Sequence, residues 1–457
     1  MAHHLLYIKT MKLLRDNFQE VPEAFMHSSN TCSWTGRHQI GGRNKEEKMK
    51  NIGTLLGLKL GLAIFCAVAA MSAAAFAEDA KPAAPAISAE DLKKTLGLSI
   101  YLQGGYTYNG NAGTVGGESE QNDFRVFDHK ANSFTLDLAQ IVFVKDPALG
   151  NAGFKLKLSA GETAKWIHSR GLSGAPLTSP QAGEGTDSFD VTEAYVSYNA
   201  AVGKGLRFDF GKFVTYNGAE VIEAIDNPNY SRSFLFNYAI PFTHTGLKMS
   251  YAFSDAVSAS FHIVNGWDNS TDNNKAKTYG LSIGFTPAEV FSGTINLMTG
   301  PEQDEQGANA PTVGSSSSNT RNLLDLVATI KPVKPLAIIL NYDDGREDNV
   351  PGALLPSGIT GDAKWSGLAG IIKYDFNDKY SLAVRGEYFD DKDGFRTGTV
   401  QKLKEVTLTP EIRLNGGVIL RPEYRHDTSD KTSFDIVNGA ATKKSQDTIA
   451  LGVMYRW

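Results

Sequence analysis

The chain has 457 residues, which is enough for one large barrel or for two or three ordinary domains. After residue 77 it contains no apolar run near the ~18 residues of a membrane-spanning helix, and this excludes a helical membrane protein. With 45 glycines, many aromatic residues and only 41% hydrophobic residues, the composition favours β structure.

Residues 49–77 have the three parts of a secretory signal peptide. A basic start at Lys50 precedes an apolar run that ends in Ala75-Phe76-Ala77, followed by a polar linker. We predict cleavage after Ala77; an anchoring helix is the disfavoured alternative. Residues 1–48 form a polar extension, which we interpret as an overcalled start.

The mature chain has no cysteine, because Cys32 and Cys66 both precede the predicted cleavage site. An exported protein without disulfides must be stabilised in another way, for example by a closed hydrogen-bonded barrel. Removal of residues 1–77 leaves 36 basic and 45 acidic residues, a net charge of −9. Nucleic acid is therefore not an expected partner.

Residues 78–96 read as a periplasmic Ala/Pro linker that ends in one short helix over 89–95. From residue 97 onward, apolar and polar residues alternate, which predicts β-strands. About sixteen strands are predicted near 97–109, 132–145, 152–163, 188–199, 205–213, 244–253, 256–265, 278–286, 290–299, 321–331, 335–343, 364–376, 379–389, 402–411, 416–426 and 445–457.

Three properties of these segments favour a membrane barrel over a soluble sheet. They are about ten residues long, their apolar faces often end in an aromatic residue, and short turns alternate with long polar loops. The fold class predicted for 97–457 is therefore all-β: a transmembrane antiparallel barrel with long extracellular loops and short periplasmic turns. An outer-membrane lipid bilayer is its expected surroundings.

The last strand ends DTIALGVMYRW, with Tyr455 and Trp457 on its apolar face. A terminal aromatic residue with a tyrosine two positions before it resembles the signal read by the outer-membrane assembly machinery. The alternative is an ordinary last strand.

No group of residues indicates an enzyme, a cofactor or a metal. The five histidines of the mature chain have no catalytic or metal-ligand spacing. The acidic segments 265–274, 343–348 and 390–394 invite a calcium interpretation, but none has the full twelve-residue spacing, and solvated loops are favoured.

Charged residues alternate with the apolar face along several strands. On the lipid side each would cost ~2–4 kcal/mol at mid-membrane, so we expect them to point inward and line a pore. The alternative is that they form ion pairs with one another. The predicted pore-lining residues are Arg207, Asp209, Arg385, Glu387, Arg421, Glu423 and Arg425.

Six segments together resemble the OmpL-like β-barrel porins and span most of 97–457. In order they are NYSRSFLFNYAIPFTHTG, VNGWDN, TGPE, WSGLAGIIKYDF, LAVRGEYFDDKDGFRTG and LRPEYRHDTSDKTSF. The resemblance implies an outer-membrane porin for passive diffusion of small hydrophilic solutes or ions. It also allows a homotrimer, although no subunit face is visible in the sequence.

The first of these segments lies in the third long loop, 214–243, and its middle is as apolar as a strand although it contains Pro228 and Pro241. In general porins this loop folds into the lumen, and the position here is similar. The constriction is therefore expected at Glu220, Glu223, Asp226, Tyr230 and Arg232, with Arg232 facing the acidic residues. A hydrophobic patch for a partner is the alternative.

Three rival functions stay open at this point. They are a sheath around a periplasmic multihaem cytochrome, an outer-membrane enzyme, and a structural barrel with a plugged lumen. The net charge and the inward arginines point in opposite directions, so the sequence leaves ion preference open.

Overall fold

The computed structural model describes residues 89–111, 121–172, 187–306, 310–437 and 440–457. The predicted extension 1–48, the signal peptide 49–77 with its cleavage after Ala77, and the linker up to residue 88 lie outside these ranges.

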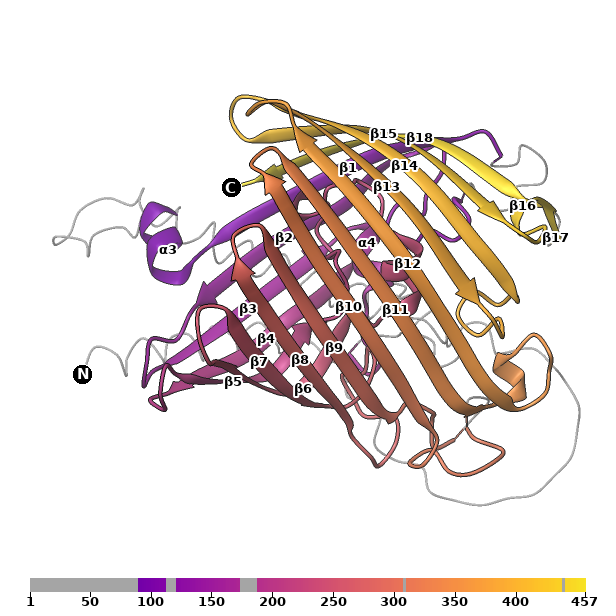
Figure 1. Ribbon diagram of the computed structural model, residues 1–457, viewed down its shortest axis with the longest axis horizontal. Helices are drawn as coiled ribbons and strands as arrows, with labels where there is room; N and C mark the ends of the chain where they lie inside the picture. Colours follow the sequence, from indigo (N-terminus) through magenta and orange to yellow (C-terminus); the bar gives the residue numbers. More distant parts are fainter. Residues whose placement is uncertain (1–88, 112–120, 173–186, 307–309, 438–439) are drawn as a thin grey trace, which may run out of the picture. The chain divides into compact units, whose positions relative to one another are not determined.

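Within the described residues, sixteen antiparallel strands close into one barrel, in which the first strand pairs with the last. Figure 1 shows the long tilted strands, with β1 beside β18. The strands are β1 (Ser99–Asn109), β2 (Phe134–Lys145), β3 (Ala152–Ala160), β4 (Phe189–Ala200), β5 (Leu206–Val214), β6 (Thr243–Ala252), β7 (Val257–Val264), β8 (Thr278–Ala288), β9 (Phe291–Pro301), β10 (Thr320–Val333), β11 (Leu336–Val350), β12 (Gly361–Asp375), β13 (Tyr380–Asp391), β14 (Gln401–Arg413), β15 (Val418–Ser429) and β18 (Ser445–Arg456). The predicted fold class is confirmed.

The remaining elements are short. They are the hairpin β16 (Phe434–Val437) and β17 (Ala440–Lys443), the helices α3 (Ala89–Leu96) and α4 (Glu162–Trp166), the 3-10 helices η2 (Ala224–Asp226) and η4 (Gly352–Leu354), and the π-helix η3 (Leu235–Ala239). None of the helices in the described part of the chain has the length and apolar character that a membrane crossing requires.

The barrel has one end with short turns. The connections there are 146–151, 201–205, 253–256, 289–290, 334–335, 376–379 and 414–417, and the other end has the long loops. This alternation is the one that the sequence predicted, and it is typical of outer-membrane barrels.

The two faces of the sheet differ in polarity, as β14 shows. Val406 and Leu408 are 56% and 41% exposed on the outside, whereas Glu405 and Thr407 are 3% and 0% exposed on the inside. In β18, Ile449, Leu451 and Val453 likewise point outward. An apolar outer face with a polar inner face suits a barrel in lipid. The interior is therefore where function is to be sought.

Candidate functional site in the barrel interior

Residues 215–242, here called loop 3, connect β5 to β6 and contact inward-facing side chains of β2, β13 and β15. The apolar middle of loop 3 is not a strand but contains the π-helix η3. Every residue from Asn229 to His244 is buried. Loop 3 therefore lies within the barrel, where its aromatic side chains are shielded from water without the alternation of a strand.

Two inward carboxylates bind the backbone of loop 3. Glu423 accepts hydrogen bonds from the amides of Tyr230 and Ser231, at 2.7 and 3.0 Å. Glu387 accepts hydrogen bonds from the amides of Phe234 and Leu235, further along the loop, at 2.6 and 2.5 Å. Bonds to charged groups are the stronger class of hydrogen bond, so each carboxylate holds two adjacent peptide units in place.

Three arginines bind the carbonyl groups of the same stretch. Arg385 donates to Ser231 O at 2.8 Å, Arg421 to Asn229 O at 3.1 Å, and Arg425 to Arg232 O at 2.6 Å. The guanidinium group suits this task because it stays charged and presents several donors in a fixed plane. Loop 3 thus meets donors and acceptors in turn along β13 and β15.

Inward glycines make room for one aromatic side chain of loop 3. The ring of Tyr230 lies over Gly105 of β1 and Gly452 of β18, and a Cβ at either position would collide with it. The Tyr230 hydroxyl donates to Asp137 Oδ2 at 2.6 Å. The ring is therefore enclosed by the seam where the barrel closes.

All seven predicted pore-lining residues lie on the inner face, where most of them are paired. Arg385 bonds Glu405 at 2.7 Å, Arg421 bonds Glu411 at 2.6 Å, and Arg425 bonds Asp427 at 2.7 Å. Asp209 meets Arg207 and Lys248, at 2.8 and 2.9 Å. Apart from Arg207 the seven are buried. Burial is tolerated because each of these ion pairs compensates its charges.

The predicted constriction residues are brought together by loop 3, but four of the five are buried. Glu220 bonds Arg385 at 2.8 Å and Glu223 bonds Lys157 at 2.9 Å. Tyr230 is 2% exposed and Arg232 is 1% exposed. Asp226 alone among them is exposed, and it pairs with Arg456.

Arg232 does not face the acidic residues across an opening. Its guanidinium donates to backbone carbonyls of loop 3 itself, those of Val221, Ile222 and Tyr230. It also lies 4.6 Å from the centre of the Phe127 ring. The reason is geometric: the loop turns back on itself, so its own carbonyls are the nearest acceptors.

Segment 121–133, between β1 and β2, also packs into the interior, which the sequence did not predict. Phe127 is 3% exposed, and its ring contacts those of Phe236 and Phe242 at 5.5 and 5.4 Å. Arg125 bonds Asp427 of β15 at 2.6 Å. A polar stretch with isolated apolar residues reads as a solvated loop, so no sequence signal marked this packing.

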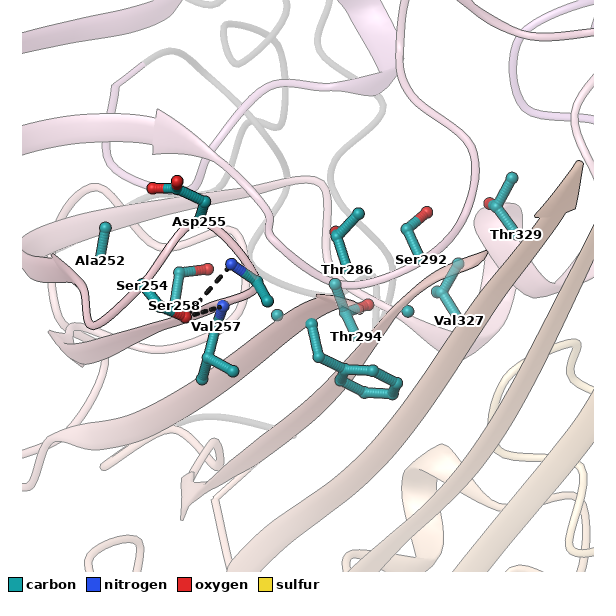
Figure 2. A pocket seen from close by; sticks show the side chains of 14 residues that line it. Ala252, Ser254, Asp255, Val257, Ser258, Thr286, Ser292, Thr294, Val327 and Thr329 are labelled. Atoms are coloured by element: carbon teal, nitrogen blue, oxygen red, sulfur yellow. Dashed lines mark hydrogen bonds between the residues drawn. The ribbon is translucent and has the colours of Figure 1, made fainter. Parts of the chain in front are cut away.

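The wall of β6–β10 near the short turns is hollowed. A cavity of about 500 Å³ is lined there by small side chains. Figure 2 shows Ser258, Ser292, Thr294 and Thr329 along this wall, beside the turn in which Ser254 accepts a hydrogen bond from the amide of Val257. A second cavity of about 400 Å³ shares Ser258 and Thr294 with it. Small hydroxyl side chains leave space that water can fill.

Five basic side chains lie in the accessible part of the interior near the short turns. Lys155, Arg207, Lys248, Lys373 and Arg413 have side chains between 23% and 31% exposed. Three of their acidic partners lie deeper, since Glu193, Asp209 and Glu411 are at most 4% exposed. Two others are more accessible: Asp146, which pairs with Arg207, is 76% exposed, and Asp375, which pairs with Lys373 and Arg413, is 42% exposed. Solvent at this end therefore meets these five basic side chains together with Asp146 and Asp375.

Two buried carboxyl groups lie in the long loops. Burial raises the pKa of Glu302 to about 7, although Thr278 donates to it at 2.6 Å. Burial likewise raises the pKa of Asp268 to about 6, while the amides of Phe242 and Thr243 donate to it. Glu302 and Asp268 thus tie the loops after β7 and β9 to the end of loop 3 and to β8.

The chain end completes the closed sheet. Trp457 and Ile100 exchange backbone hydrogen bonds at 2.9 and 3.0 Å, and Tyr455 pairs with Leu102. Lys93 of α3 lies 4.7 Å from the centre of the Trp457 ring. The structure places both aromatic residues at the seam, while their predicted role in assembly stays a prediction.

Three solved structures of similar fold are an outer-membrane channel and two porins. The outer membrane channel DcaP of Acinetobacter baumannii has a TM-score of 0.51 and 13% identity, over 79% of this chain and 96% of that one. An anion-selective porin from Comamonas acidovorans has a TM-score of 0.51 and 12% identity, over 79% of this chain and 98% of that one. Salmonella typhi OmpF in complex with daunomycin has a TM-score of 0.52 and 12% identity, over 79% of this chain and 97% of that one. At 12–13% identity, the similarity to these structures shows that the chain shares their fold.

No curated protein matches the chain by sequence. The family model described as "Putative beta-barrel porin-2, OmpL-like" matches residues 95–457, which is the whole barrel together with the end of α3. The match bears out the resemblance drawn from the six segments. The chain therefore belongs to the OmpL-like β-barrel porin family.

Proposed function

We propose that the protein lets small hydrophilic solutes or ions diffuse passively across the outer membrane, along an aqueous path narrowed by loop 3. The observation that carries the proposal is the position of loop 3 inside the barrel. It is held by Glu387 and Glu423 on one wall, while the wall of Ser258, Ser292 and Thr294 is hollowed. Selectivity follows from the width of the path and its lining charges.

The charges of the path favour anions in this proposal. The accessible basic side chains near the short turns, such as Arg207 and Lys248, stand in front of the buried Asp209. Cations held at the surface of a narrow aqueous path raise the local concentration of anions. Glu220, Glu223, Tyr230 and Arg232 then act by shaping loop 3, and Asp226 is the constriction residue that solvent reaches.

Planar-bilayer recording of purified, refolded protein tests both the aqueous path and its preference for anions. We expect stepwise conductance and, in a potassium chloride gradient, a reversal potential that favours chloride. Lys248→Gln should shift that potential towards potassium, whereas Lys404→Gln, which removes the same charge from the exposed outer face, should not. Absence of steps from folded protein would refute the open path and would favour a plugged structural barrel.

Three further parts of the proposal concern the surroundings of the barrel. We expect a homotrimer, export through a signal peptide cleaved after Ala77, and insertion by the outer-membrane assembly machinery. Native mass spectrometry of detergent-solubilised protein tests the first two, through the subunit number and the mass of the mature chain. Co-purification of a haem protein would favour the sheath, and phospholipid hydrolysis would favour the enzyme.

A further inference from the structure

Three polar side chains form a row across adjacent strands of the inner wall. In the strand register, Asn296 of β9 is opposite Asp325 of β10, and Asp325 is opposite Asp343 of β11. All three residues are 0% exposed. Directly opposite side chains on one face have Cβ atoms about 5 Å apart, so the two carboxylates are close neighbours.

The pair of carboxylates lacks a compensating positive charge. Among the described residues, neither Asp325 nor Asp343 forms an ion pair with a lysine, arginine or histidine, in contrast to the paired acids of β13–β15. Like charges directly opposite each other destabilise a sheet, and burial without a counter-charge adds to this cost. The row therefore requires either a cation or a shared proton.

The donors that reach Asp325 are neutral. Its Oδ1 accepts from the amide of Gly218 at 3.1 Å and from Asn296 Nδ2 at 2.5 Å. Its Oδ2 accepts from Asn341 Nδ2 at 2.7 Å. These bonds orient the carboxylate but cannot neutralise it, and each oxygen keeps capacity for another partner.

Buried oxygen atoms around the pair have no hydrogen-bond partner. Within the described residues they are Asp343 Oδ1 and Asn296 Oδ1. Asn217 Oδ1, in a residue only 2% exposed next to Gly218, whose amide binds Asp325, has no partner either. Since the amide nitrogen of Asn296 is on Asp325, its oxygen is held beside that carboxylate. Buried oxygen lone pairs that face no donor can bind a cation, which then supplies the missing partner.

We propose that Asp325 and Asp343, with the side-chain oxygens of Asn296 and Asn217, bind a divalent metal ion of the Ca²⁺ type. Carboxylate and amide oxygens are the ligands of this hard cation, and two positive charges balance the two carboxylates. Ca²⁺ accepts irregular shells of six to eight oxygens, whereas Mg²⁺ demands a regular octahedron and keeps several waters. The ion would tie the start of loop 3 to β9–β11.

Asp343 belongs to the acidic segment 343–348, for which the sequence favoured a solvated loop. The structure places that segment in β11, where Asp343 is opposite Asp325 of β10 and accepts a hydrogen bond from Asn341 Nδ2 at 3.4 Å. This inference goes beyond the proposed function because it concerns a bound ion and not permeation. Its test needs no conductance measurement.

Calorimetric titration of chelator-treated, refolded protein with CaCl₂ in detergent tests the site. We expect saturable uptake near one Ca²⁺ per chain, and affinity at least about tenfold lower in Asp343→Asn and in Asp325→Asn. Asp344→Asn is the matched control: it removes the same charge from the neighbouring residue, which is exposed on the outer face. Its affinity should equal that of the unaltered protein.

Thermal unfolding keeps the test decisive if a variant folds poorly. Ca²⁺ should raise the unfolding midpoint of the unaltered protein and of Asp344→Asn, because a ligand stabilises the state that binds it, and should not raise that of Asp343→Asn. Equal uptake by all variants would overturn the site. So would the absence of uptake by folded protein; an infrared carboxylic-acid band that Asp343→Asn removes would then assign a shared proton to the pair. Channels that conduct without binding Ca²⁺ would refute the site alone.

Discussion

Replacement of Glu423 by alanine should release the middle of loop 3 from the barrel wall. The change removes the acceptor of two buried amides, those of Tyr230 and Ser231. A buried donor left without a partner costs about 1–3 kcal/mol, so the two together cost about 2–6 kcal/mol. The strands remain paired, and Arg421 and Arg425 keep Glu411 and Asp427 as partners.

Hydrogen exchange measured by mass spectrometry in detergent reads this release directly. Because local opening sets the exchange rate, a cost of about 2 kcal/mol accelerates exchange of the peptide over 227–236 by about 30-fold. Glu423→Gln, which keeps one acceptor oxygen, should fall between. Glu289→Ala, at an exposed position of a short turn, should change nothing in this peptide. Equal exchange in Glu423→Ala and the unaltered protein would refute the anchoring of loop 3.

Three more predictions concern the seam, the long loops and the chain end. Gly452→Val should displace the ring of Tyr230 and loosen loop 3. In the double variant Gly452→Val/Tyr230→Ala the clash is relieved. Hydrogen exchange of the peptide over 227–236 measures both effects. Since the folded-state pKa of Glu302, about 7, lies above its ordinary value of 4.5, its contribution to stability is full below pH 4.5 and is lost as the pH rises through 7. Exchange of the peptide over 265–278, corrected for intrinsic rates, should therefore increase from pH 5 to pH 8, and Glu302→Gln should flatten that increase. Trp457→Ala keeps the backbone bonds to Ile100, so we expect refolded barrels of near-normal stability but less protein in the outer membrane of cells; normal membrane levels would contradict the assembly role.

The strands could be predicted because alternation reports directly on a barrel with an apolar outside. The predicted 278–286 and 402–411 became β8 (Thr278–Ala288) and β14 (Gln401–Arg413). Prediction stopped too early at β11, placed at 335–343 but observed at Leu336–Val350. Its second half is acidic, and an acidic run resembles a loop when the inner partners of the strand are unknown.

The interior could be predicted only in outline. Alternation put Arg385 and Glu423 on the inner face, and the apolar stretch in loop 3 indicated burial. Their bonds to Ser231 and Tyr230 depend on where loop 3 crosses the barrel, which is a tertiary property. For the same reason, the packing of Phe127 and the row of Asn296, Asp325 and Asp343 required the strand register.

The unit conductance of a variant with a shortened loop 3 tests the central claim most directly. In this variant a short Gly-Ser linker replaces residues 219–240, which removes η2, η3 and the residues bound by Glu387 and Glu423. If loop 3 narrows an aqueous path, stepwise conductance in planar bilayers should rise several-fold over that of the unaltered protein, with the reversal potential closer to zero. Equal unit conductance of the two barrels would contradict the claim.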